Sequence, residues 1–308
     1  MSNIPFLDSA HHGKNSWWRY LITIILTLAV APVVAGAIIG FLLALVIMFF
    51  SQNMDVSILL YQLSSTDALM NSPLLFLVLV AIAYALAFFF LYLALRVLHK
   101  REFISIINIY KKVRWNKIIK GAGLWFFLMV IADLISYLIA PGDFIINFNP
   151  QNFVLLAIIA LIAFPIQASL EELVFRGYIM QGIGLLFKKP FSVVIVSAIC
   201  FAVLHWFNGS NLTMSASITG GAFIIGIMLG IITLADNGIE LAVGIHIINN
   251  LYVSVIHSAP ESGLGSLPSL IVSPMDPYTS PFSLIILSAV VIFVLFRHRK
   301  DDLRRVFY

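Results

Sequence analysis

Long apolar runs separated by short polar stretches make up most of this 308-residue chain. The runs lie near residues 20–50, 74–98, 121–140, 152–187, 191–207, 218–235, 239–256 and 282–296. An α-helix needs about 20 apolar residues to cross the hydrocarbon core of a bilayer, and most of these runs approach or exceed that length. They lack the alternation of apolar and polar residues that is typical of transmembrane barrel strands. The pattern therefore predicts an all-α fold: a polytopic membrane helical bundle of about eight transmembrane helices.

The amino-acid composition also indicates a membrane protein. It is 61% hydrophobic and 10% charged, whereas soluble domains carry about 25% charged residues. So few polar residues cannot form the surface of a soluble protein, and the eight runs leave no room for a sizeable soluble domain. The single cysteine, Cys200, excludes an internal disulfide and a cysteine metal cluster.

With the exception of Arg176, the basic residues are confined to alternate connections between the runs. Lys and Arg precede the first run and follow the second, fourth and last runs, but they are absent from the connections near 51–73, 141–151, 208–217 and 257–281. Since Lys and Arg collect in cytoplasmic loops of membrane proteins, both termini are predicted to be cytoplasmic. The net charge of +4 then reflects membrane topology and gives no indication of a nucleic-acid partner. We expect an integral, multi-pass protein of a prokaryotic cell membrane.

Three parts can be distinguished along the chain. Residues 1–150 hold the first three transmembrane helices, and residues 151–256 hold the polar groups described below. Residues 257–308 comprise an outer loop, the last helix and a basic cytoplasmic tail. Within the first part, basic and apolar residues intermingle near 102–120, which predicts an interfacial amphipathic helix on the inner leaflet. The alternative is a plain basic loop.

A few ionisable residues lie within the apolar runs, where each costs free energy unless it is paired or faces a cavity. They are Asp133, Glu171, Glu172, Arg176, His205 and His246. Glu172 and Arg176 are four positions apart and can pair on one helical face. Glu171 lies about 140° around the axis from Arg176, so the same arginine can hardly neutralise it. Glu171 is thus a candidate general acid or base, or alternatively a group that only lines a polar pocket.

Two further motifs place polar groups on other helices. Phe201 and His205 share one helical face, as do His246 and Asn250. A single membrane histidine is more often a hydrogen-bonding group than a catalyst. A carboxylate, two imidazoles and an amide together, however, suit the hydrolysis of an amide bond. For Asp133, which has no assigned partner, we expect a structural hydrogen bond.

These three motifs resemble the pattern of the CPBP intramembrane proteases. That family includes the CAAX prenyl endopeptidases and the bacterial Abi-type proteins related to bacteriocin immunity. Its pattern is EExxxR, FxxxH and HxxxN on successive helices, and all three elements occur here between residues 151 and 256.

The resemblance implies a role for each matched residue. Glu171 and His205 would activate the attacking water, and His246 and Asn250 would stabilise the oxyanion. The structural support of the site would come from Glu172, Arg176 and Phe201.

The resemblance leaves the use of a metal open. Glu171, His205 and His246 could form a zinc site with an open fourth position. Against zinc, the chain has no HExxH motif, and Glu171 cannot easily act as both ligand and base. We favour activation of water without a cofactor and keep zinc as the alternative.

The expected function is that of an intramembrane endopeptidase acting on a membrane peptide or a lipidated protein, including a prenylated CAAX-like tail. One alternative is a non-enzymatic transporter or channel, although the paired broken helices typical of transporters are not found. Another is a catalytically idle bacteriocin-immunity or scaffold protein.

The depths of the candidate residues disagree if every run is a simple helix. Counted from the inner ends at 1.5 Å per residue, Glu171 and His205 lie about 25 Å deep and His246 only about 15 Å deep. The disagreement disappears if the 235–239 connection lies inside the bundle and Pro165 breaks the run 152–187.

Overall fold

The computed structural model describes residues 4–50, 72–261 and 267–308, and these residues are mostly helical. Seven helical stretches among them are long and apolar enough to cross a membrane. They are Trp17–Leu42, Pro73–His99, Trp115–Ile139, Pro150–Gly184, Pro190–Asn208, Leu212–Asp236 and Thr279–Phe296. The remaining predicted run forms a shorter apolar helix, Glu240–Ile256. The prediction of an all-α polytopic membrane bundle is thereby confirmed.

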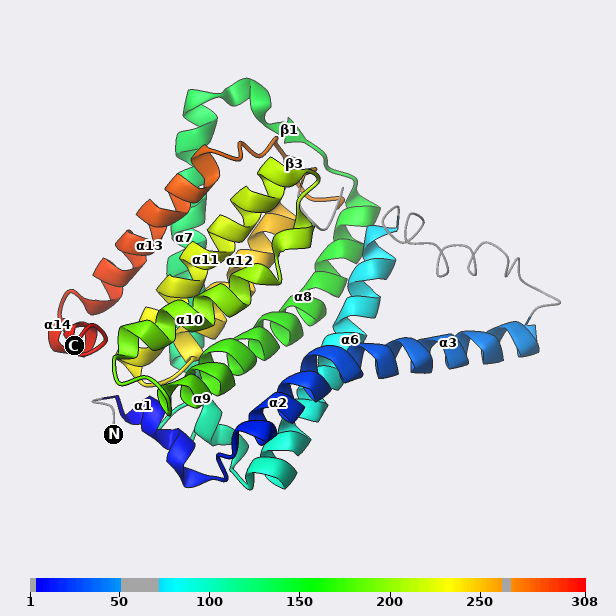
Figure 1. Ribbon diagram of the computed structural model, residues 1–308. Coiled ribbons are helices and arrows are strands. Elements are labelled where there is room, and N and C mark those ends of the chain that lie inside the picture. Colours follow the sequence, from blue (N-terminus) through cyan, green and yellow to red (C-terminus); the bar gives the residue numbers. More distant parts are fainter. Residues whose placement is uncertain (1–3, 51–71, 262–266) are drawn as a thin grey trace.

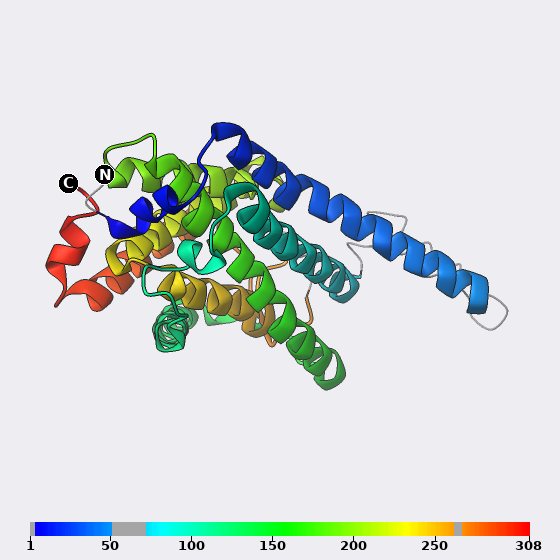
Figure 2. The ribbon, with the colours of Figure 1, turned by 90° about the horizontal axis from the view of Figure 1, so that it is seen from below.

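The N-terminal part begins with the short helices α1 (Pro5–Asp8) and η1 (Ser9–His12). The first long helix consists of α2 (Trp17–Ile25), the π-helical segment η2 (Leu26–Val30) and α3 (Ala31–Phe50). In Figures 1 and 2, α3 extends away from the other helices. Next come α6 (Pro73–Ala94) with the π-helical η3 (Leu95–His99), the 3₁₀ helix η4 (Phe103–Ile106) and α7 (Trp115–Ile139).

The C-terminal part contains the helices that bear the motifs. After η5 (Pro141–Asp143) comes a continuous helical run of α8 (Pro150–Glu172), the π-helical η6 (Leu173–Ile179) and α9 (Met180–Gly184). It is followed by α10 (Pro190–Val203), η7 (Trp206–Asn208), α11 (Leu212–Asp236), α12 (Glu240–Leu251) and the π-helical η8 (Tyr252–Ile256). The last helices are α13 (Thr279–Phe296) and α14 (Lys300–Arg304).

A small sheet closes one end of the bundle (Figure 1). Its strands are β1 (Ile145–Ile146), β2 (His257–Ser258) and β3 (Ile271–Val272), in the order β1-β3-β2. The pairing of β3 is antiparallel with β1 and parallel with β2. Helices α1 and α14 both lie at the opposite end of the bundle in Figure 1, which agrees with the same-side termini predicted from charge.

Helix α12 packs closely against α7 and is also in contact with α8 and α11. The contact with α7 depends on two glycines. A Cβ atom at Gly244 would overlap the Ile118 carbonyl, and one at Gly121 would overlap the Leu241 carbonyl. Because these glycines let the two backbones approach closely, the polar residues of α12 are held at a fixed depth within the bundle.

The connection between α11 and α12 is buried, as the depth argument requires. Asp236 and Glu240 are each 1% exposed. We call these two residues the inner carboxylates. The basic partners of Asp236 are Arg114 at 3.0 Å, Lys117 at 2.9 Å and Arg299 at 2.7 Å. The pKa of Arg114 is raised above its usual value. Burial alone would lower this pKa, but the hydrogen bond to Glu240 and the charge of Asp236 outweigh burial.

Two local predictions are wrong. Pro165 does not break its helix but lies inside α8. A proline removes one backbone N–H donor, and membrane helices tolerate this loss where other groups compensate for it. The stretch 102–120 does not form an amphipathic helix before α7 starts at Trp115; it is the 3₁₀ helix η4 and an irregular connection. Asn108 explains the difference: it is buried, bridges to Gly238 and donates a hydrogen bond to Glu240.

Candidate active site

A cavity of about 810 Å³ lies between α6, α8, α10, α11 and α12 and extends to the loop that carries β3. Its volume is in the range of small-molecule sites, about 300–1,000 Å³. The cavity brings together all four predicted catalytic residues: it is lined by Glu171, His205, His246 and Asn250. These residues come from separate helices, so tertiary packing of the bundle assembles the site.

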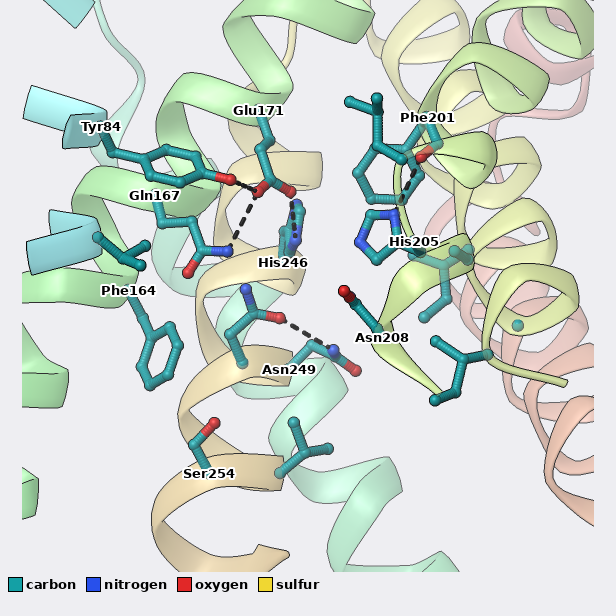
Figure 3. A pocket seen from close by; sticks show the side chains of 18 of the residues that line it. Tyr84, Phe164, Gln167, Glu171, Phe201, His205, Asn208, His246, Asn249 and Ser254 are labelled. Atoms are coloured by element: carbon teal, nitrogen blue, oxygen red, sulfur yellow. Dashed lines mark hydrogen bonds and ion pairs between the residues drawn. The ribbon is translucent and has the colours of Figure 1, made fainter. Parts of the chain in front are cut away.

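Glu171 lies in the last turn of α8 with its carboxylate at the cavity wall (Figure 3). Its Oε1 accepts hydrogen bonds from the Tyr84 hydroxyl at 2.8 Å and from Gln167 Nε2 at 3.1 Å. Its Oε2 is buried, lies 3.5 Å from His246 Nε2 and has no hydrogen-bond partner among the described residues. Neutral donors therefore hold one oxygen of this carboxylate, and the other is left without a hydrogen bond.

The predicted pair of Glu172 and Arg176 is present and fully buried, with Glu172 Oε1 2.8 Å from Arg176 Nη1. Glu172 Oε1 is also 2.7 Å from His246 Nδ1. The Arg176 guanidinium lies over the Phe201 ring, 4.4 Å from its centroid. Phe201, Glu172 and Arg176 thus form a layer directly behind the cavity wall, and this layer fixes the orientation of His246.

The chain changes from α-helical to π-helical geometry immediately after Glu172. π-helical turns are rare and occur often at functional sites. Gly177 lies within this segment, and a Cβ atom there would be 2.5 Å from the Ile106 carbonyl oxygen. The π-helical segment therefore packs against η4, and the two glutamates lie directly before it at the end of α8.

The two histidines occupy different positions relative to Glu171. His246 contacts both glutamates, one through each ring nitrogen. His205 faces the cavity from another wall (Figure 3), and its Nδ1 lies 2.9 Å from the Phe201 carbonyl oxygen. Because α10 ends at Val203, His205 lies just beyond the helix on which the spacing placed it. The imidazole beside Glu171 is thus that of His246, while His205, which the family resemblance implies to act with Glu171, lies on another wall of the same cavity.

Asn250 lines the cavity together with its neighbour Asn249. Asn249 donates a hydrogen bond to Asn250 Oδ1 at 3.3 Å and accepts one from Trp125 Nε1 at 3.1 Å. The sequence analysis did not identify Asn249, Tyr84 or Gln167. Gln167 precedes Glu171 by one helical turn and could have been found by spacing, but Tyr84 has no local signal in its apolar run.

The proposed zinc ligands do not converge on one point. No group of three or more His, Cys, Asp or Glu side chains in the described part of the chain could hold a metal ion. His246, moreover, uses one nitrogen for Glu172 and directs the other toward Glu171. As arranged here, Glu171, His205 and His246 do not fit a metal site, and no catalytic step is derived through one.

Comparison with known families addresses the same part of the chain. Residues 150–252 match the family model described as type II CAAX prenyl endopeptidase Rce1-like. We call these residues the Rce1-like domain, after the family model that they match. The Rce1-like domain runs from the start of α8 to the end of α12 and contains all three motifs. This match confirms the resemblance to the CAAX prenyl endopeptidases and supports a membrane protease of the CAAX type.

The similarity to one relative extends beyond the Rce1-like domain. A Bacillus subtilis (strain 168) protein, "Uncharacterized protein YyaK", is 29% identical over 293 residues, which cover 94% of this chain and 95% of the relative. No solved structure matches the chain. Together with the seven apolar helices, these findings identify a multi-pass, prokaryotic type of membrane protein.

Proposed function

We propose that the chain is an intramembrane endopeptidase that hydrolyses a peptide bond of a membrane-associated substrate. The observation that carries the proposal is the environment of Glu171. Two neutral donors hold one carboxylate oxygen, and the other faces a cavity beside His246. A positioned carboxylate with one oxygen free of hydrogen bonds next to an oriented imidazole is an arrangement suited to general base catalysis.

In the proposed reaction, Glu171 and His205 activate a water molecule within the cavity. The water oxygen attacks the carbonyl carbon while its proton passes to the Glu171 carboxylate. Donors from His246 and the Asn250 amide stabilise the negative charge that develops on the carbonyl oxygen. The C–N bond then breaks as Glu171 delivers this proton to the leaving nitrogen. Glu172 and Arg176 position His246 and do not touch the substrate.

The proposed substrate is a membrane peptide or a lipidated protein, including a prenylated CAAX-like tail. Apolar side chains make up most of the cavity wall around the polar groups, among them Phe76, Val80, Phe164 and Leu170. Such a wall favours a substrate with a long apolar part, because burying apolar surface contributes about 25 cal/mol per Å².

The decisive experiment is a cleavage assay with purified protein and a panel of prenylated, unprenylated and transmembrane peptides. Glu171→Gln is expected to reduce the cleavage rate by about 10²-fold or more, the usual contribution of a general base. Glu102→Gln is the matched control, because Glu102 does not line the cavity. Cleavage that survives Glu171→Gln, or the absence of any cleaved peptide, would refute the proposal.

The same assay addresses the cofactor. We propose catalysis without a metal, so cleavage should be insensitive to incubation with a strong zinc chelator. Loss of cleavage with the chelator and recovery on adding zinc would overturn the metal-free mechanism.

A further inference from the structure

A second chain of polar contacts lies along the same cavity, and its members apart from Tyr252 lie outside residues 150–252. His257 Nδ1 is 2.8 Å from Asp133 Oδ2, and His257 Nε2 is 2.6 Å from Ser273 Oγ. Asp133 Oδ2 also accepts a hydrogen bond of 2.6 Å from the Tyr252 hydroxyl. Asp133 therefore has hydrogen-bond partners, as the sequence predicted, but the connection continues through the imidazole to a serine.

The small sheet determines this arrangement. His257 in β2 pairs with Ile271 in β3, and the Ser273 N–H donates to the Ser258 carbonyl at 3.1 Å. This register places the Ser273 hydroxyl against the His257 ring. The ring is packed on its flank by Phe144, with centroids 5.0 Å apart. The serine and the histidine are thus held by backbone pairing and ring packing as well as by their mutual hydrogen bond.

The connectivity is that of an activated serine. The carboxylate contacts Nδ1 and the hydroxyl contacts Nε2, which is the order of groups in a serine–histidine–aspartate triad. When Nδ1 donates its proton to Asp133, Nε2 is left to accept the proton of the hydroxyl. A nucleophile next to a base that is itself oriented by a third group is the general signature of covalent catalysis.

Ser273 and His257 are accessible from the cavity. Both line it, whereas Asp133 lies behind the histidine. The neighbouring wall consists of apolar side chains, including Val253, Met275 and Leu284. We propose that Ser273 is the nucleophile of a second catalytic centre, which acts on a carboxylic ester with a long apolar acyl chain.

The reaction balances with the ester and water alone. Ser273 Oγ forms a bond to the ester carbonyl carbon, and the hydroxyl proton moves to His257 Nε2. The C–O bond to the alcohol breaks, and the alcohol leaves with the proton from His257. Water then attacks the acyl-serine, releases the carboxylic acid and restores the serine hydroxyl. Asp133 is a positioning residue that orients His257.

The test uses the full-length protein in detergent with two probes. One is an alkyl fluorophosphonate, which labels activated serines by replacing fluoride, and the other is the p-nitrophenyl ester of a long-chain fatty acid. Labelling is expected at Ser273 by peptide mass spectrometry. Ser273→Ala should abolish labelling, and His257→Gln should slow ester hydrolysis by about 10²-fold or more.

Ser258→Ala is the matched control, because Ser258 also lines the cavity but bonds to Ser269 and not to a histidine. It should retain labelling and ester hydrolysis. For Asp133→Asn, the readout is the pH dependence of the labelling rate, which a structural hydrogen bond alone would leave unchanged. If the wild type is not labelled at Ser273, or if the pH profile is unchanged in Asp133→Asn, the three residues are only a structural clamp between α7 and the sheet.

Discussion

At the scale of single residues, the charge balance around His246 determines how the site is built. Glu171 and Glu172 place two carboxylates in a buried region. The Arg176 guanidinium contacts the carboxylate of Glu172. His246 lies between the carboxylates and contacts one oxygen of each. Any change to one member of this set therefore leaves another member buried without its partner, which is costly in a membrane interior.

This charge balance gives a prediction for stability. Glu172→Gln should destabilise the protein by about 3–5 kcal/mol, because it leaves the Arg176 charge buried and unpaired. The double variant Glu172→Gln/Arg176→Met should be less destabilised than Glu172→Gln alone. Thermal or denaturant unfolding in detergent measures both. Additive losses in the double variant would show that the pair does not act as a unit.

Tyr84 gives a prediction for activity. Tyr84→Phe removes the hydroxyl that donates to Glu171 Oε1. A hydrogen bond to a charged group contributes about 1.5–3 kcal/mol, so the cleavage rate should fall by roughly 10- to 100-fold while the protein stays folded. Tyr92→Phe is the matched control on the same helix, because Tyr92 is 40% exposed and does not line the cavity. Equal rates for the two variants would contradict a role for Tyr84.

The residue-level predictions from sequence succeeded where the interaction is local. The Glu172–Arg176 pair follows from the spacing along one helix. The position of His246 against Glu171 does not, because it depends on how α12 packs against α8. Tyr84 was missed for the same reason: its partner is 87 positions away in the chain. Whether the motif residues carry the roles implied by the family resemblance stays a prediction for the cleavage assay.

At the scale of elements, the close approach of α7 and α12 keeps the polar face of α12 in place. Gly121 and Gly244 lie under carbonyl groups of the opposite helix. Backbone that is this close cannot accept an added methyl group without moving one helix. Displacement of α12 would move His246 and Asn250 together relative to Glu171.

Alanine substitutions test this contact. Gly244→Ala should destabilise the protein by about 1–3 kcal/mol and lower cleavage, because the added methyl overpacks the interface. Gly123→Ala in α7 is the matched control, since nothing lies within 4 Å of a Cβ atom there. That change should be neutral or stabilise the helix by up to about 1 kcal/mol. The same destabilisation at both positions would indicate that the α7–α12 contact is not the cause.

The helices themselves were predictable from the sequence because hydrophobic runs of membrane length leave the backbone few alternatives. One of the two local errors concerns Pro165, which lies inside α8 because membrane helices tolerate a proline. The other, the shape of the 102–120 segment, depends on hydrogen bonds from neighbouring elements, which the segment alone does not reveal. Asn108 and Glu240, for example, are 132 positions apart in the chain.

At the scale of the whole molecule, the distribution of charge predicts the orientation in the membrane. Helices α1 and α14, near the two ends of the chain, lie at the end of the bundle opposite the sheet. The sheet belongs to connections that contain no Lys or Arg. The side with the termini is therefore predicted to be cytoplasmic, and the sheet with Ser273 to lie on the other side.

Cysteine labelling in intact cells checks this orientation in a Cys200→Ser background. Tyr278→Cys and Tyr308→Cys form a matched pair, since both tyrosines are strongly exposed, at 76% and 89%. A membrane-impermeant maleimide should label the cysteine at 278 in intact cells and the cysteine at 308 only after lysis. The reverse pattern would show that the bundle has the opposite orientation.

The salt bridges of the inner carboxylate Asp236 also determine the order in which these contacts can form during synthesis. Arg114 and Lys117 precede Asp236 in the chain, but Arg299 follows it by 63 positions. At about 5–20 residues per second, a ribosome needs roughly 3 to 13 s to make that stretch. The helix that bears His246 is completed early in this interval, while Asp236 still lacks one of its cations. Of the three salt bridges that hold Asp236, the one to Arg299 can therefore form only near the end of translation.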